Sequence, residues 1–173
     1  MNHVKRIALI STGGTIEKTY DELSGVLANT LVSVLDVMLA SLELRGVAVQ
    51  RVALMNKDSL EMTADDHTLI AETAARMARE TDGVVVVHGT DRLANTGERI
   101  VEVAGTPASP IVLTGAMRPY ELRTTDALQN LTEALLAVQL VAPGVYVAMH
   151  NQVLKFPGVR KDRALGTFVK DAP

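Results

Sequence analysis

The sequence contains no cysteine and no tryptophan, and only 3% of its 173 residues are aromatic. Without cysteine the chain has no disulfide, no Cys-ligated zinc and no thiol nucleophile. Because aromatic side chains are scarce, the core has to consist of aliphatic residues, which is typical of a buried parallel sheet covered by helices. The length allows one well-packed domain and is short for two.

The charge pattern and the apolar runs exclude several partners. The formal net charge is -3, and Lys and Arg form no continuous stripe, so we expect no nucleic-acid partner. No apolar run approaches the roughly 20 residues that span a bilayer, so we expect no membrane partner. The apolar run that ends at Ile10 is too short for a signal-peptide core and predicts a first strand. These features favour a cytoplasmic protein.

Short apolar runs alternate with amphipathic stretches along the chain. The predicted strands are residues 6–11, 47–55, 84–88, 111–115 and 145–150. The predicted helices cover residues 31–42, 63–77, 95–104 and 125–138, with a capping box from Thr63 to Asp66 and Thr125 as a further cap. Strands separated by helices predict an α/β fold, a three-layer α/β/α sandwich with a mainly parallel, flavodoxin- or Rossmann-like sheet. Residues 17–29 and those after 153 are polar and read as loops.

Polar residues follow four of the predicted strands. We call the residues directly after the carboxyl end of a strand its exit. The four exits are Thr-Gly-Gly-Thr at 12–15, Asn-Lys-Asp-Ser at 56–59, His-Gly-Thr-Asp at 88–91 and Thr-Gly-Ala-Met-Arg-Pro at 114–119. In an open parallel sheet, ligands bind beyond the carboxyl ends of the strands. We therefore expect a site built from hydroxyls, carboxylates and glycine backbone at this edge.

Each exit also has an ordinary structural interpretation when it is taken alone. The Gly13-Gly14 pair brings backbone N–H groups close to a ligand, but it also suits a plain turn. It is neither a Walker loop nor a dinucleotide-binding fingerprint, so nucleotide binding is weakly supported. Thr90 or Asp91 is equally suited to be a helix N-cap, and Asp58 with Ser59 to be a turn. His88 reads as a partly buried, hydrogen-bonded histidine and not as a metal ligand, and we expect no metal or cofactor.

Taken together, the motifs resemble those of the bacterial-type L-asparaginase family. Thr-Gly-Gly-Thr-Ile stands at 12–16 and His-Gly-Thr-Asp at 88–91, with Gly-Ala-Met-Arg-Pro at 115–119 as a third match. A fourth match is the segment from Asn151 to Lys161, which is similar to the one that carries the catalytic lysine of the family. The resemblance covers the N-terminal domain of the family, so we expect residues 1–173 to form one such catalytic domain without a C-terminal domain.

The resemblance implies a threonine hydroxyl that attacks the side-chain amide of L-asparagine. An acyl-enzyme forms as ammonia leaves, and water then releases L-aspartate. By this resemblance, Thr15 stands at the position of the family's nucleophile and Tyr20 at that of the residue that activates it. Thr90, Asp91 and Lys161 stand at the positions of the family's second threonine, carboxylate and lysine. The residues expected to contact the substrate are Gly14, Asp58, Ser59, Gly89, Thr90, Asp91 and Ala116. Ser59 would hold the α-carboxylate and Asp91 the α-ammonium, and which threonine attacks stays open.

The resemblance also implies that the site is completed from elsewhere. In the family a second domain, usually from a neighbouring subunit, supplies an acidic residue, so we expect a homo-oligomer, dimer or tetramer. Acidic candidates within this chain are Glu17, Asp21 and Glu61. Two alternatives remain beside an asparaginase. One is a glutaminase or other amide hydrolase, such as one that acts on a tRNA-bound amide with a partner. The other is a catalytically weak amino-acid-binding remnant.

Overall fold

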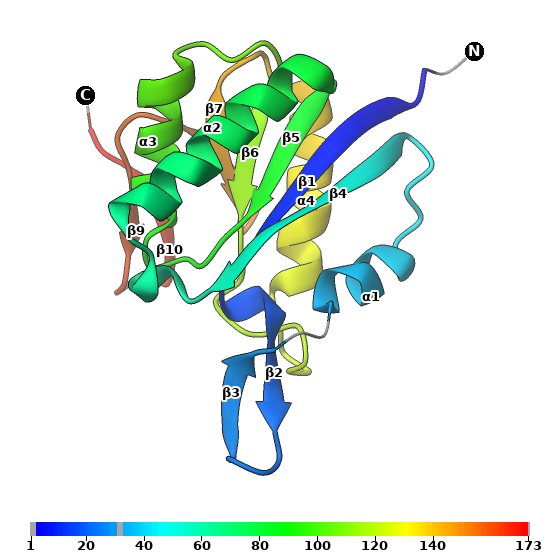
Figure 1. Cartoon of the computed structure of the whole chain (residues 1–173), viewed down its shortest axis with the longest axis vertical. Coiled ribbons are helices and arrows are strands. Elements are labelled where there is room, and N and C mark those ends of the chain that lie inside the picture. The colour runs from blue at the N-terminus through cyan, green and yellow to red at the C-terminus, as the bar shows by residue number, and fades with distance from the viewer. Residues whose placement is uncertain (1–2, 31–32, 173) are drawn as a thin grey trace.

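The computed structural model describes residues 3–30 and 33–172 and contains a central six-stranded sheet (Figure 1). The strands, in spatial order, are β4 (Val47–Lys57), β1 (Lys5–Gly13), β5 (Gly83–Val87), β6 (Ile111–Thr114), β7 (Val145–Met149) and β8 (Gln152–Lys155). The first five run parallel, and β8 pairs antiparallel with β7. The predicted mainly parallel sheet is therefore confirmed.

Helices cover both faces of this sheet. They are α1 (Val34–Ala40), α2 (Ala64–Glu80), α3 (Leu93–Ala104) and α4 (Ala127–Leu140). Along β1, Ile7 and Leu9 pack with α1 and α4, whereas Ala8 and Ile10 pack with α2 and α3. Because successive side chains of a strand point to opposite faces, the unbroken apolar run of β1 creates two cores. The architecture is the predicted three-layer α/β/α sandwich (Figure 1).

The central strand β5 shows why an aliphatic chain suffices for this fold. All four valines of residues 84–87 are fully buried, two in each core. Burial of a valine side chain stabilises a fold by roughly 1.5–3 kcal/mol, so this one strand anchors the sheet. Its carboxyl end, where His88 begins, is therefore a rigid starting point for the loop that follows.

The helix starts agree with the sequence in part. At α2 the Thr63 hydroxyl accepts from the Asp66 N–H at 3.2 Å and the Asp66 carboxylate accepts from the Thr63 N–H at 2.9 Å, which confirms the capping box. The cap of α4 is Asp126 instead of Thr125, although the Thr125 hydroxyl accepts from Ala127 N–H.

Two other helix starts differ from the prediction. The helix α3 begins at Leu93, before the predicted residue 95, and its cap is Arg92. The interpretation of Thr90 or Asp91 as an N-cap is therefore wrong, and both side chains are available for other contacts. The described part of α1 begins at Val34, and the predicted start at residue 31 lies outside the described residues.

The two segments predicted as loops are in fact β-hairpins. They contain β2 (Lys18–Asp21), β3 (Val26–Asn29), β9 (Val159–Asp162) and β10 (Thr167–Lys170), while β8 extends the main sheet. Each hairpin turns at a glycine with positive φ, Gly25 or Gly166, which is the conformation glycine permits. The strands have four residues each with largely exposed or half-buried side chains, so they carry no strong alternating apolar signal.

The hairpins lie outside the sandwich on two sides. The β2–β3 hairpin projects away from the body of the molecule beyond the carboxyl end of the sheet, and β9–β10 lies beside α3 (Figure 1). Within residues 3–30 and 33–172, no helix combines the length and the hydrophobicity that a bilayer crossing requires.

Candidate active site

The exits of β1 and β5 touch backbone to backbone. Gly14 has φ +86°, and a Cβ on it would lie 2.4 Å from the Gly89 nitrogen and 2.5 Å from its Cα. Only glycine satisfies both the positive φ and the missing space. Thr15 and Thr90 each follow this contact by one residue, so the two motifs that looked like separate turns form one structure.

The exits of β4 and β6 join the same structure. A Cβ on Gly89 would lie 2.8 Å from the Ser59 hydroxyl oxygen, and one on Gly115 would lie 2.3 Å from the His88 carbonyl oxygen. Ala116, the next residue, is buried. The four strand exits therefore converge at one edge of the sheet, as the sequence predicts.

Lys161 enters this edge from the β9–β10 hairpin. Its Nζ donates to Thr90 Oγ1 at 2.8 Å and to Asp91 Oδ1 at 2.9 Å. The lysine side chain is 16% exposed and Thr90 is buried. A charge-assisted hydrogen bond in a largely desolvated place is stronger and better aligned than one on the surface. A hydroxyl, a carboxylate and an ammonium thus meet at the positions that the motifs predict.

Arg163 is a member of this cluster that the sequence reasoning missed. Its Nη2 donates to Asp91 Oδ1 at 3.0 Å, so Asp91 faces two cations. The available signal is the two-residue spacing from Lys161, which places side chains on one side of an extended segment. Asp91 therefore keeps an ionic partner even when one of the two cations moves to another group.

Thr15 and Tyr20 have different surroundings. Thr15 opens a short 3₁₀ turn, η1 (Thr15–Glu17), and its half-buried hydroxyl makes no hydrogen bond to any described residue. Asn29 Nδ2 donates to the Gly14 carbonyl at 2.9 Å and so ties the turn to β3. Tyr20 is 58% exposed on β2, its N–H donates to the Glu121 carboxylate, and its hydroxyl has no partner within the described part of the chain. The structure does not bring the Tyr20 ring to the lysine cluster.

Asp58 and Ser59 form the exit of β4. The hydrogen bond from Lys18 Nζ at 2.8 Å is the main reason why the pKa of Asp58 is lowered. Ser59 begins the 3₁₀ turn η2 (Ser59–Glu61), is buried, and its Oγ accepts from the Arg92 N–H at 3.2 Å. Since the oxygen is an acceptor there, the hydroxyl proton of Ser59 is left to donate to a ligand.

The acidic candidates of the loop do not join the lysine cluster. Glu17 is buried and lines a cavity of about 310 Å³ together with Arg51, and burial raises its pKa although Arg51 opposes this. Asp21 accepts from Ser24 in the hairpin turn, and this bond lowers its pKa. Glu61 is exposed.

The buried carboxylate of Asp126 holds the backbone that follows β6. Asp126 accepts from the N–H groups of Met117 and Arg118, both at 3.0 Å, and pairs with His150 Nε2 at 2.7 Å. Burial raises the pKa of Asp126, but these hydrogen bonds outweigh burial and hold the pKa below its ordinary value. A pocket of about 390 Å³ opens between this group and Lys161.

His88 is hydrogen-bonded, as predicted, and it is completely buried, whereas the sequence suggested partial burial. Its Nδ1 contacts the Gly89 carbonyl at 2.7 Å and its Nε2 contacts the Thr96 hydroxyl at 2.7 Å. Complete burial lowers its pKa to about 4, so the ring is neutral at pH 7. Among residues 3–30 and 33–172, no three His, Asp or Glu side chains gather as a metal site would require.

Comparison with known proteins gives one family. The family model described as asparaginase, N-terminal, matches residues 6–168. An L-asparaginase from Thermococcus kodakarensis is 31% identical over 162 residues, which are 93% of this chain and 49% of that protein. A glutamyl-tRNA(Gln) amidotransferase subunit from Haloquadratum walsbyi is 35% identical over 146 residues, which are 83% of this chain and 33% of that protein.

Solved structures agree with the sequence comparison. The thermostable L-asparaginase from Thermococcus kodakarensis matches with a TM-score of 0.84 and 29% identity, over 95% of this chain and 51% of that one. A probable cytoplasmic L-asparaginase from Campylobacter jejuni matches with a TM-score of 0.74 and 29% identity, over 96% and 51%. The chain spans about half the length of the L-asparaginases it matches. It belongs to the asparaginase family and has the fold of that family's N-terminal domain.

Proposed function

We propose that this chain hydrolyses the side-chain amide of L-asparagine to L-aspartate and ammonia, through a threonine nucleophile and an acyl-enzyme. The observation that carries the proposal is the contact of Lys161 Nζ with Thr90 Oγ1 at 2.8 Å and Asp91 Oδ1 at 2.9 Å. A threonine hydroxyl is a poor nucleophile without a group that takes its proton. Lys161, placed on the Thr90 hydroxyl, supplies a proton acceptor that Thr90 can relay to an attacking threonine.

The proton balance follows from this contact. As an ammonium, Lys161 donates to Thr90 Oγ1 and cannot accept a proton. It becomes a base once it has passed one proton to water. Thr90 Oγ1 then passes its proton to Lys161 and takes the hydroxyl proton of the attacking Thr15 as the bond from Thr15 Oγ1 to the amide carbon forms. The same path returns the proton to the amide nitrogen, which leaves as ammonia. The second cation on Asp91, Arg163, keeps the carboxylate paired throughout.

The two ends of the substrate backbone have matching groups at the same edge. The Ser59 hydroxyl has a free proton for the α-carboxylate, and Asp91 offers its remaining acceptor capacity to the α-ammonium. The glycine contact between Gly14 and Gly89 lets the substrate amide lie against backbone N–H groups without a Cβ in the way. These features support an amino-acid amide as the substrate class.

Either threonine is a candidate for the nucleophile. The Thr15 hydroxyl makes no hydrogen bond to any described residue, whereas the Thr90 hydroxyl accepts a hydrogen bond from Lys161. We propose that Thr15 attacks and that Thr90 with Lys161 relays protons, with Tyr20 assisting Thr15 after a movement of the β2–β3 hairpin. The exposure of Tyr20 supports such a movement, which has to break the hydrogen bond of its N–H to Glu121.

A second candidate is an amide hydrolase that works with a partner protein. Relatives named as subunits of glutamyl-tRNA(Gln) amidotransferase share 28–35% identity with this chain. In that case free L-asparagine and L-glutamine would be turned over slowly, and the amide would be presented by the partner.

Release of ammonia by the purified chain tests the proposal. We expect turnover of L-asparagine that exceeds that of L-glutamine. Slow turnover of both amides would favour the second candidate, and binding of L-aspartate without turnover of either amide would indicate an amino-acid-binding protein instead of an enzyme.

The assembly and location are part of the same proposal. We propose that the chain forms a homo-oligomer in which a neighbouring copy covers the open edge of the sheet and contributes an acidic residue. Residues 1–173 would then act as one catalytic domain of a cytoplasmic enzyme that uses no metal or cofactor.

A further inference from the structure

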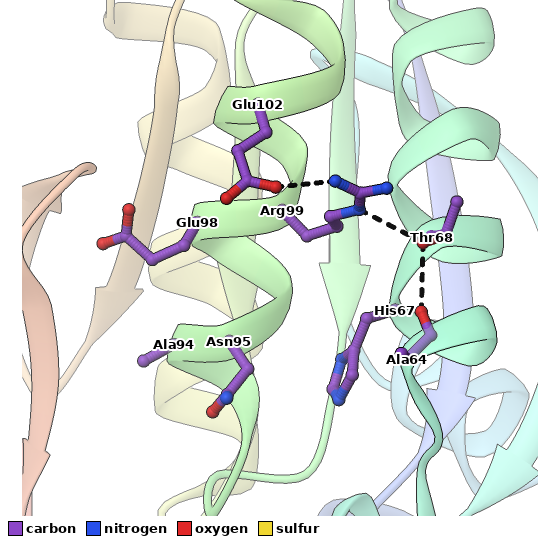
Figure 2. Close-up of a pocket in the computed structure, with 8 residues that line it drawn as sticks. All are labelled: Ala64, His67, Thr68, Ala94, Asn95, Glu98, Arg99 and Glu102. Atoms are coloured by element: carbon purple, nitrogen blue, oxygen red, sulfur yellow. Dashed lines mark hydrogen bonds and ion pairs between the residues drawn. The ribbon is translucent and has the colours of Figure 1, made fainter.

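Three buried side chains connect the groove between α2 and α3 to the loop that carries Thr90. His67 Nδ1 lies 2.6 Å from Thr96 Oγ1, which lies 2.7 Å from His88 Nε2. His88 Nδ1 in turn lies 2.7 Å from the Gly89 carbonyl oxygen. The ring of His67 projects from α2 into the space between the helices, in a pocket of about 570 Å³ (Figure 2). None of the three side chains has a place in the proposed chemistry.

The direction of this hydrogen-bond chain is fixed at its inner end. A carbonyl oxygen only accepts, so His88 Nδ1 carries the proton, and the neutral ring must accept at Nε2. Thr96 therefore donates its one hydroxyl proton to His88. The Thr96 oxygen can then only accept from His67, so His67 also carries its proton on Nδ1. The low pKa of His88, about 4 because of its complete burial, keeps Nε2 an acceptor at neutral pH.

The inner end of the chain acts on the peptide before Thr90. The Gly89 carbonyl and the Thr90 N–H belong to one planar trans peptide group and point in opposite directions. A carbonyl held by His88 therefore turns the Thr90 N–H away from the core. Gly14 and Ser59 pack against the same glycine and fix the backbone before it, so the hydrogen bond from His88 acts on the peptide that follows.

We propose that His67, Thr96 and His88 form a positioning relay that orients the Gly89–Thr90 peptide and thereby sets the Thr90 hydroxyl against Lys161. The proposal rests on the proposed function for its kinetic test alone. All three residues are positioning residues, because they act on Thr90 through the backbone and none of them touches the substrate.

The charged groups around the outer end leave the direction of the relay unchanged. Burial is the main cause that lowers the pKa of His67, Arg92 lowers it further and Asp66 opposes them. The charged residues of α3 that line the same groove are Glu98, Arg99 and Glu102. Protonation of His67 adds a proton at Nε2 and keeps the donor at Nδ1, so the relay holds until His88 itself is protonated.

A kinetic comparison of threonine variants tests the relay. Thr96→Val keeps the shape and removes the hydroxyl, and it should lower kcat roughly 10- to 100-fold with little change in KM, because small misplacements of a reacting group cost rates of this order. Thr96→Ser restores the hydroxyl and should restore kcat. The matched control is Thr81→Val, since the buried Thr81 hydroxyl donates to backbone carbonyls at the far end of α2. A normal kcat in Thr96→Val, or an equal loss in Thr81→Val, would overturn the relay.

A double-mutant comparison separates a relay from independent packing effects. Breaking the hydrogen-bond relay at two places should lower kcat no more than breaking it at one. His67→Leu combined with Thr96→Val should therefore have the kcat of the worse single variant. His67→Asn, which places an amide donor near Nδ1, should lie close to the unmodified protein. Multiplied losses in the double variant would show separate effects and contradict the relay.

Nitrogen NMR of the histidine rings tests the relay without any activity. Both His67 and His88 should carry the proton on Nδ1 at pH 7, and the Thr90 amide signal should shift in Thr96→Val but stay in Thr81→Val. An Nε2–H tautomer in either ring would overturn the relay. If the protein releases no ammonia while these NMR results hold, the proposed function fails and the relay stands.

Discussion

Thr15 and Thr90 each follow a glycine of the same backbone contact, yet their hydroxyls have different partners. Thr90 Oγ1 accepts from Lys161, whereas Thr15 Oγ1 has no partner within the described residues. A hydroxyl that already accepts from an ammonium is prepared for proton transfer, and an unoccupied one is prepared to meet a substrate. The difference supports a division of labour between the two side chains.

Removal of either hydroxyl should therefore stop the reaction without unfolding the protein. We predict that Thr15→Ala and Thr90→Val each lower kcat for L-asparagine by about three orders of magnitude or more, while the melting temperature changes little. Steady-state ammonia release measures the first effect and circular dichroism the second. The control is Thr73→Val, whose hydroxyl bonds only to its own helix. Near-normal kcat in one variant would remove that threonine from the mechanism.

The buried His88 makes stability depend on pH. Its pKa is about 4 in the folded protein and about 6.5 when exposed, so the unfolded chain binds the proton first as pH falls. The contribution of His88 to the free energy of unfolding should thus be nearly constant above pH 6.5 and fall between pH 6.5 and 4, by about 3 kcal/mol. The lowered pKa of His67 acts in the same direction.

Denaturant titrations at pH 7, 5.5 and 4.5 measure this dependence. His88→Asn keeps a donor for the Gly89 carbonyl and removes the titrating ring, so its stability should vary much less over this range. Burial raises the pKa of Glu17, which works in the opposite direction but equally in both proteins. If the free energy of unfolding changed equally with pH in both proteins, His88 would not be the source of the pH dependence.

At the scale of elements, the contact between the exits of β1 and β5 is the feature on which the site depends. Gly14→Ala would force a Cβ to within 2.5 Å of the Gly89 backbone at a positive φ. We predict a loss of more than about 2 kcal/mol in unfolding free energy from strain and overpacking, with a loss of turnover. Denaturant unfolding checks it. Gly46→Ala, where a Cβ meets only the Gln139 side chain at 3.6 Å, is the control and should stay within about 0.5 kcal/mol.

The sequence predicts the elements whose burial is strong. The valines of β5, the apolar face of α2 and the Thr63 capping box carry periodic or capping signals, and the structure confirms these elements. The prediction of loops at the β2–β3 and β9–β10 hairpins is wrong, because short strands exposed on one or both faces have no such period. Lys161 and Thr90 are 71 residues apart in sequence, so their contact is expected from the family motifs and not from any local sequence pattern.

Some contacts of the site have no local signal at all. Lys18 pairs with Asp58 and Asn29 with the Gly14 carbonyl only because the base of the hairpin, where both residues lie, is beside the sheet edge. The structure also leaves Tyr20 exposed, so its expected role with Thr15 stays a prediction. Side chains delivered by hairpins are thus the part of the site that sequence reasoning places least well.

At the scale of the molecule, the chain spans about half the length of the L-asparaginases it matches, and its four strand exits meet at one edge of the sheet. If a second copy covers this edge, the protein should elute as a dimer or larger species. Size-exclusion chromatography with light scattering measures the mass, against the 18.5 kDa of one chain. A strict monomer with full activity would refute the shared site.

Lys161 and its threonines are the groups on which the proposed hydrolysis of an amino-acid amide depends. Its most direct test is ammonia release from L-asparagine by the unmodified chain, by Lys161→Met and by Lys155→Met, an exposed lysine on β8. Arg163 still pairs with Asp91 in the Lys161 variant, so that carboxylate is not left alone. We predict rapid release by the unmodified chain and by Lys155→Met, and a loss of at least about 100-fold in Lys161→Met. Equal release by all three proteins would contradict the account.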